Sequence, residues 1–205
     1  SYSVRIISDE RIADYVRPVV KNGVFSVFLD EKKFTPELKK ELKAKGAAEP
    51  VLEIEIYAPY IKKLELKDKA VLLDSDQLKV DNFSLNMAGN SKINGLDIEC
   101  VAADLDFGGS SNSNVSVDVD TKLNITAGNS STINLTQKGG NSIVNTKGSA
   151  VLNLNVNAVD IDIEAAGGSS TYISGVASML EVEASAGALI DAEALEAKEG
   201  NFIQS

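Results

Sequence analysis

Three pairs of aspartates are the side chains of this chain whose type and spacing could do chemistry. One residue separates the two members of each pair, which are Asp104 and Asp106, Asp118 and Asp120, and Asp160 and Asp162. Two carboxylates on one face of a strand could serve an inverting glycoside hydrolase or bind calcium. Alternation in a solvent-facing strand produces the same spacing. We expect this structural role for all three pairs.

Other catalytic groups are missing from the sequence or badly placed. The chain contains no histidine, which excludes Ser-His-Asp and Cys-His machinery. The single cysteine, Cys100, lies in an alternating segment that predicts a buried apolar role. The glycine-serine segments are followed neither by a Lys-Ser/Thr pair nor by a helix, so they do not predict a phosphate-binding loop. We therefore predict no enzyme, no catalytic or metal-binding residues and no cofactor.

The elements that carry these residues form an internal repeat. Apolar–polar–apolar triplets begin at Leu85, Leu105, Leu123, Ile161 and Leu180, and a weaker copy begins at Ile143, where Asn145 replaces the second apolar residue. Successive starts lie 18 to 20 residues apart. A glycine follows each triplet, at Gly89, Gly108, Gly128, Gly148, Gly167 and Gly187. Glycine with a neighbouring Asn or Ser favours sharp corners. A second short strand follows the corner, as in Ser131–Leu135, and a third precedes the next copy, as in Val115–Val119.

The repeat distinguishes between two all-β architectures. Alternation as in Leu152–Asn157 and Val159–Glu164 fits either an antiparallel sandwich or a β-helix. Only in a β-helix do residues one period apart stack as neighbouring strands, so only there must residue types recur at equivalent positions. We predict a single-stranded β-helix, a solenoid of about six coils of 18–20 residues.

The first part of the chain is less regular. Strands are predicted at Val24–Leu29 and Leu52–Ile56, a tight turn at Asn22-Gly23, and a short helix within Thr35–Gly46, which has a capping residue, an early proline and a closing glycine. We predict that residues 1–50 form a strand and helix cap packed on the solenoid. Residues 51–205 then form one continuous β-helix.

Charge distribution limits the partners. Residues 1–82 balance 15 basic against 15 acidic side chains, whereas residues 83–205 carry 5 lysines, no arginine and 15 acidic side chains. Such a surface repels phosphate backbones and anionic headgroups, so nucleic acid and membrane surfaces are not expected partners. No apolar run is long enough for a transmembrane segment. Ser1 is not an initiator methionine, and we expect that a signal sequence has been removed.

The order of segments resembles the head GIN domain family of auto-transporter adhesins, a domain of unknown function common in Bacteroidetes. The resemblance rests on the strand–proline motif Leu52–Pro59 with the strand that follows it, and on the turns Ala88–Ser91, Ala127–Ser130 and Ala166–Ser169. The chain departs from the family by its helical insertion and by its ending NFIQS. The resemblance implies a right-handed β-helix, a periplasmic or cell-surface location at the outer membrane, and an adhesin role.

Three functions follow as hypotheses. We predict a secreted or cell-surface binding or structural module whose partner is an unknown glycan or an envelope or host protein. The alternatives are a pectin-type polysaccharide enzyme that uses the paired aspartates, and an envelope sensor domain that binds another protein. A lyase would need an Arg or Lys base, yet no arginine follows Arg17, and Phe107 and Tyr172 are the aromatic residues firmly inside the repeats.

Polar residues beside the glycines form a further candidate surface. They either bond to one another up the stack, which we favour, or present a flat polar face to glycan hydroxyls or a protein. These residues are Asn90, Ser91, Ser110, Ser111, Asn129, Ser130, Ser149, Ser169 and Ser170.

Overall fold

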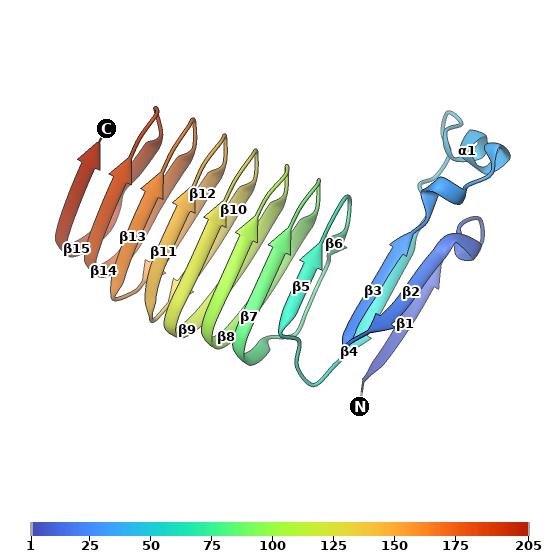
Figure 1. Ribbon diagram of the computed structural model, residues 1–205, viewed down its shortest axis with the longest axis horizontal. Helices are drawn as coiled ribbons and strands as arrows, with labels where there is room; N and C mark the ends of the chain where they lie inside the picture. Colours follow the sequence, from blue (N-terminus) through green and yellow to red (C-terminus); the bar gives the residue numbers. More distant parts are fainter. Residues whose placement is uncertain (1, 205) are drawn as a thin grey trace. The chain divides into compact units, whose positions relative to one another are not determined.

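The alternating segments after residue 60 stack as parallel strands in the computed structural model, which describes residues 2–204. Leu85 pairs with Leu105, Leu105 with Ile125, and so on through the stack at intervals of 19 or 20 residues. The result is a β-solenoid of about seven turns (Figure 1). This confirms the predicted all-β solenoid, whose right-handedness stays a prediction.

Each turn has two faces joined by a tight glycine corner and a rounder bend, which form opposite edges of the solenoid in Figure 1. The first face follows the corner and contains β6 (Val71–Leu72), β10 (Thr132–Lys138) and β12 (Val151–Asn157). The second face contains β5 (Lys63–Leu66), β11 (Asn141–Thr146) and β13 (Asp160–Ala165). Five longer strands run through the bend and contribute to both faces: β7 (Leu78–Met87), β8 (Lys92–Phe107), β9 (Asn112–Ala127), β14 (Ser170–Ala184) and β15 (Leu189–Gln204).

Two of the three short strands predicted for each coil occupy the same face instead of separate ones. Thr132 pairs with Asn112 and Leu135 with Val115, so Ser131–Leu135 and Val115–Val119 occupy overlapping positions on the first face. A coil therefore has two faces rather than three strands.

The register differs from the predicted alignment at two positions. Leu123 pairs with Ala103 rather than Leu105, a shift of two residues. Ile143 pairs with the outward-facing Asn124 and Asp162, so the inward residues of that coil are Ser142, Val144 and Thr146 instead. The cause is the short Gly139-Gly140 bend, in which both residues have positive φ.

The core is a set of columns of inward side chains, one per strand position. Leu85, Leu105 and Ile125 form one column, in which each side chain is at most 2% exposed. Met87, Phe107 and Ala127 form the next column, in which the Phe107 ring lies beside the Ala127 methyl group. Phe107 is fully buried, as predicted.

The corners stack because one residue per turn takes left-handed backbone angles. Those residues are Asp68, Gly89, Gly109, Asn129, Gly148, Gly167 and Ala186, and in the last corner Gly187 also has positive φ. At Gly109, an added Cβ would lie 2.4 Å from the carbonyl oxygen of Gly89, so the two corner backbones are in direct contact. The predicted corners are confirmed, although Asn129 rather than Gly128 takes the left-handed conformation in the third one.

The smaller unit ends at Pro59, and the solenoid unit begins at Tyr60. The smaller unit contains two antiparallel strand pairs, β1 (Ser3–Ser8) with β4 (Leu52–Tyr57) and β2 (Val16–Lys21) with β3 (Val24–Leu29). The boundary between the two units therefore lies after β4, whereas we predicted it after residue 50. Packing of this unit on the solenoid stays a prediction.

Three short helices complete the smaller unit: the 3-10 helices Ala13–Tyr15 and Glu31–Lys33, and α1 (Pro36–Leu42). The predicted capping of α1 is confirmed, since the Leu38 N–H donates to Thr35 Oγ1 at 3.1 Å. Leu38 packs with Ile12 and Phe34 in a small core. The Asn22-Gly23 turn has positive φ at both residues, as a tight hairpin requires.

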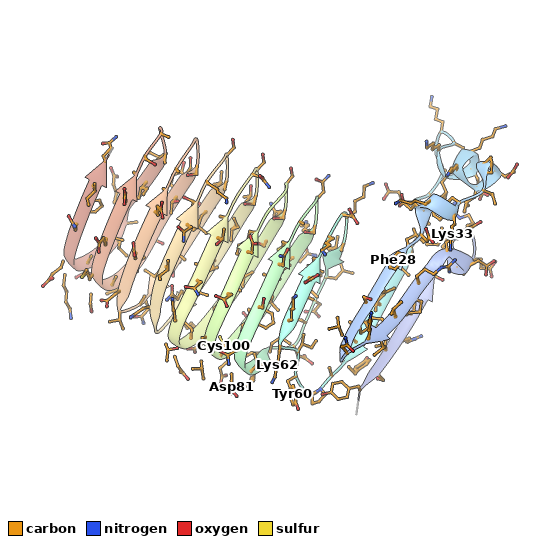
Figure 2. The ribbon with its side chains drawn as sticks, viewed as in Figure 1. Phe28, Lys33, Tyr60, Lys62, Asp81 and Cys100 are labelled. Atoms are coloured by element: carbon orange, nitrogen blue, oxygen red, sulfur yellow. The ribbon has the colours of Figure 1, made fainter. Side chains whose placement is uncertain are left out.

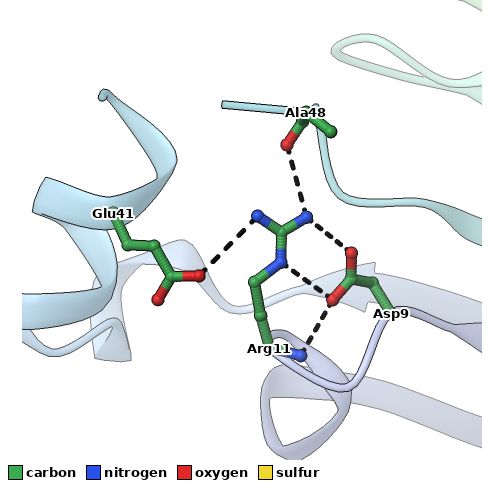
Figure 3. Close-up of polar contacts among 4 residues, drawn as sticks. All are labelled: Asp9, Arg11, Glu41 and Ala48. Carbon is green, nitrogen blue, oxygen red and sulfur yellow. Dashed lines mark hydrogen bonds and ion pairs between the residues drawn. The ribbon is translucent and has the colours of Figure 1, made fainter. Parts of the chain in front are cut away.

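Arg11 connects the loops of the smaller unit through hydrogen bonds and an ion pair (Figure 3). Its Nε and one terminal nitrogen donate to the two oxygens of Asp9 at 3.0 and 2.6 Å. The guanidinium also donates to the Ala48 carbonyl at 3.3 Å and lies 3.8 Å from Glu41 of α1. The side-chain hydrogen bonds from Arg11, helped by its backbone N–H, lower the pKa of Asp9 to about 2.

We expect Arg11→Met to raise the pKa of Asp9 toward its ordinary value of about 4, because the side-chain donors that stabilise the carboxylate are lost while the backbone N–H of residue 11 remains. The folded-state pKa of Asp9 is lowered, so its contribution to stability is present above pH ~4 and is lost as the pH falls toward the pKa of about 2. Carboxyl-carbon NMR titration measures this pKa directly. Arg5→Met, which removes an exposed pair with Glu55, should leave Asp9 unchanged. A wild-type Asp9 that titrates near pH 4 would contradict the account.

Candidate binding groove

An open groove of about 650 Å³ runs across the strands of the first face. It lies between two rows of outward side chains that are two residues apart along each strand. The residue between them points inward, so backbone and buried side chains such as Val115 and Leu135 form the floor. The two rows are about 6.6 Å apart, measured between the Cα atoms of residues two apart in a strand. We call this the first-face groove.

The first row consists mainly of asparagines. Its members are Asn114, Asn134, Asn153, Tyr172 and Asp191. Asn134 Nδ2 donates to Asn114 Oδ1 at 2.8 Å, and Asn153 Nδ2 donates to Asn134 Oδ1 at 2.9 Å. Asn114 Nδ2 donates to the Asn94 carbonyl at 3.2 Å. These bonds hold the amides in one orientation along the solenoid axis.

Four of the six side chains in the second row, those of Ser116, Thr136, Ser174 and Ala194, are shorter than asparagine, which keeps the channel open. Its members are Asp97, Ser116, Thr136, Asn155, Ser174 and Ala194. Asn155 Nδ2 donates to Ser174 Oγ at 2.9 Å, so this row is also ordered in part. Hydroxyl groups of Ser116 and Thr136 face the groove from this side.

Backbone bulges bound the groove at both ends. Register shifts occur between Ile93 and Leu96 and again between Tyr172 and Ser174. Gly175 follows the second shift with φ +110°, and a Cβ there would lie 2.0 Å from the Val156 carbonyl oxygen. The backbone of residue 175 can lie this close to Val156 only because residue 175 has no side chain.

The lining is nearly uncharged. It contains amides, hydroxyls, one aromatic ring and no lysine or arginine, and its two carboxylates, Asp97 and Asp191, lie at opposite ends. Tyr172 is 40% exposed, so its ring is available to a ligand. This set of groups can bind hydroxyls and apolar faces, but it contains neither a nucleophile with an adjacent base nor a cluster of metal ligands.

The paired aspartates lie away from the first-face groove. Asp104 and Asp106 project from the second face, and Asp162 follows Asp104 in the same row three strands along, about 14 Å away. Asp118 lies near the bend of the first face opposite Glu99 and Lys138, and Asp120 lies at the bend itself. The described residues contain no group of three or more acidic or cysteine side chains that could hold a metal ion.

Asp160 and Asp162 line a smaller depression of about 320 Å³ on the second face, together with Glu181 and Lys122. This depression is where an aspartate-dependent enzyme would have to work. The three predicted pairs are not brought together there or elsewhere.

Cys100 is buried near the bend (Figure 2). Burial, with a smaller contribution from Asp120 and Asp118, raises the pKa of its thiol to about 11. A neutral buried thiol is unreactive, in agreement with the predicted structural role.

The predicted corner ladder does not form as expected. Three of its residues, Ser91, Ser111 and Ser169, point inward and are at most 2% exposed, as is the neighbouring Ser131. Ser131 and Ser169 bond to carbonyls of their own corners, while the Oγ atoms of Ser91 and Ser111 have no hydrogen-bond partner among the described residues. The ladder of amides runs instead through the first-face groove, whose row of asparagines the sequence analysis missed.

One family model matches the chain twice, over residues 1–122 and 101–202. It is described as "Putative auto-transporter adhesin, head GIN domain". The chain belongs to this family. Two overlapping matches are expected when successive segments of one solenoid repeat the same pattern of strands and corners. No curated protein and no solved structure matches the chain.

Membership of the head GIN domain family agrees with the resemblance seen in the sequence. The family's description names an adhesin, which implies that the domain binds a partner without naming it. Among residues 2–204, no helix has the length and apolar character needed to cross a membrane.

Proposed function

We propose that this head GIN domain is a non-catalytic, adhesion-type binding module and that the first-face groove is its binding site. The ordered row of asparagine amides carries the proposal. Asn134 bonds to Asn114 on one side and to Asn153 on the other, so the side chains are oriented before any ligand arrives. Preorganised groups reduce the entropy lost on binding.

The proposed site of action is outside the cytoplasm, at the cell surface or in the periplasm. The family description supports it, since it names an auto-transporter adhesin. The acidic charge of residues 83–205 argues against nucleic acid and anionic lipid as partners.

Retention of protein-coated beads on defined surfaces tests this function. The surfaces are neutral polysaccharide, polygalacturonate, mucin, collagen and fibronectin. Ser116→Trp would fill the channel, and Thr126→Trp, in the same strand β9 but on the second face, is the matched control. We expect retention on at least one surface and a loss of about tenfold or more for Ser116→Trp alone. Retention on no surface, or equal loss for both variants, would refute the proposal.

The depression around Asp160 and Asp162 is the basis for the rival function, a polysaccharide-active enzyme. We expect wild-type protein to release no new reducing ends from neutral or acidic polysaccharides, with or without calcium. Asp162→Asn should leave bead retention unchanged, because the residue lies on the second face. Turnover that Asp160→Asn or Asp162→Asn abolishes would replace the binding function by the enzymatic one.

A further inference from the structure

We infer that the ligand of the first-face groove is an extended, uncharged polysaccharide that lies along the solenoid axis. This inference rests on the proposed binding function and specifies the chemical class of the ligand. It is argued from the spacing, the hydrogen-bonding capacity, the charge and the single aromatic residue of the groove.

The spacing of the groove suits a repeating ligand. Equivalent residues of adjacent coils are one strand spacing apart, about 4.8 Å, so the six coils that line the groove from Gly95 to Asp191 span about 24 Å. An extended β-1,4-linked hexose chain advances by close to one strand spacing per sugar residue. A chain in the groove can therefore place about one sugar residue beside each coil.

The amides retain capacity for a ligand after the ladder has formed. An asparagine side chain has two N–H donors and an oxygen with two lone pairs. Asn134 uses one donor toward Asn114 and one lone pair toward Asn153, which leaves one donor and one lone pair for a ligand. Thr136 adds a hydroxyl across the channel. Sugar hydroxyls both donate and accept, and so match this mixed array.

The charge of the groove lining argues against polyanions and polycations as ligands. A polyanion would find no lysine or arginine in the lining and would meet carboxylates at both ends, Asp97 and Asp191. A polycation would find carboxylates only at those ends and neutral groups between them. Protein interfaces rely on several buried aromatic or arginine anchors, whereas the groove offers one aromatic residue, Tyr172. A neutral polymer with many hydroxyls is the ligand that these groups complement.

Tyr172 supplies the apolar contact that such a ligand needs. It occupies the row position after Asn153, and 40% of its surface is exposed. The ring face carries partial negative charge, and the axial C–H groups of a β-linked hexose present a flat, weakly positive apolar surface to it. We expect this ring to contribute more to affinity than any single amide.

Affinity electrophoresis of the whole chain provides the test. Native gels contain glucomannan, hydroxyethylcellulose or, as the anionic comparator, polygalacturonate. We expect retardation in at least one neutral gel and none with polygalacturonate. Tyr172→Ala should weaken this binding about tenfold, and Tyr172→Phe should stay within about twofold because the ring is retained. Ile143→Ala, a truncation of a 37%-exposed side chain on the second face, is the control and should have no effect.

A second pair of variants tests the amides in the same gels. Asn134→Ala removes two ladder bonds in the groove, and Asn124→Ala removes the corresponding bond to Asp104, 2.6 Å long, on the second face of the neighbouring coil. We expect only Asn134→Ala to reduce retardation. Calorimetry with glucomannan oligosaccharides of increasing length should show affinity that rises until the chain spans the groove and then levels off.

The inference is overturned if no neutral polysaccharide retards the protein, if polygalacturonate alone does so, or if folded Tyr172→Ala binds like the wild type. Circular dichroism establishes that each variant is folded. Retention on mucin, collagen or fibronectin that Ser116→Trp abolishes, without retardation in any neutral gel, would leave the proposed binding function standing and would refute the polysaccharide.

Discussion

Gly175→Ala should destabilise the solenoid by about 3 to 5 kcal/mol. Gly175 has φ +110°, a conformation that alanine rarely adopts, and its new Cβ would lie 2.0 Å from the Val156 carbonyl oxygen. Relief of the clash requires β14 to move away from β12, to which residue 175 is paired through Val156. Urea unfolding followed by circular dichroism measures the loss as a lower midpoint.

Gly95→Ala is the matched control. Gly95 lies at the other bulge of the first face, but its φ is not in the left-handed region and no atom lies within 4 Å of the added Cβ. The exchange should change the free energy of unfolding by less than about 0.5 kcal/mol. Similar midpoints for Gly175→Ala and Gly95→Ala would show that the coils do not approach each other as closely as described.

Phe107→Ala should cost about 3 to 5 kcal/mol. Phe107 is the bulkiest of the fully buried side chains and lies between Met87 and Ala127 in one column. Its small neighbour Ala127 cannot expand into the space, so the substitution leaves a cavity. The same urea titration measures this loss.

Phe202→Ala makes the same truncation on the same face, in β15, where the ring is 63% exposed. It should cost no more than about 0.5 kcal/mol. A cost for Phe107→Ala as small as that for Phe202→Ala would mean that residue 107 does not face the interior of the solenoid.

The architecture could be predicted because its determinants recur in the sequence. A left-handed residue is needed once per turn, and glycine satisfies that need at Gly89, Gly109, Gly148 and Gly167. The alternation that makes Leu152, Leu154 and Val156 inward-facing is also visible directly.

The register was harder to predict, for a physical reason. Alternation has a period of two, so a shift of two residues, as between Leu123 and Leu105, leaves every side chain on its correct side. The one-residue error at Ile143 arose because the Gly139-Gly140 bend shortens that coil to 19 residues. Bend length is set by backbone contacts between coils, which single-sequence patterns do not display.

The groove was missed although its signal is present. Asn114, Asn134 and Asn153 each lie five residues after a left-handed corner residue, as does Tyr172 after Gly167. The polar residues predicted at the corners themselves include serines that are buried, such as Ser91 and Ser111. What the sequence could not show is that short side chains such as Ser116 and Thr136 lie in register in a second row beside the asparagines, and this register forms the channel.

Side-chain amide NMR during titration with a glucomannan oligosaccharide tests the central claim most directly. The N–H₂ signals of Asn114, Asn134 and Asn153 should shift with a common affinity, because these amides line the first-face groove. Those of Asn86 and Asn124, which lie on the second face, should not move. Shifts confined to the second-face amides, or no shifts at any amide, would contradict the assignment of the groove as the binding site.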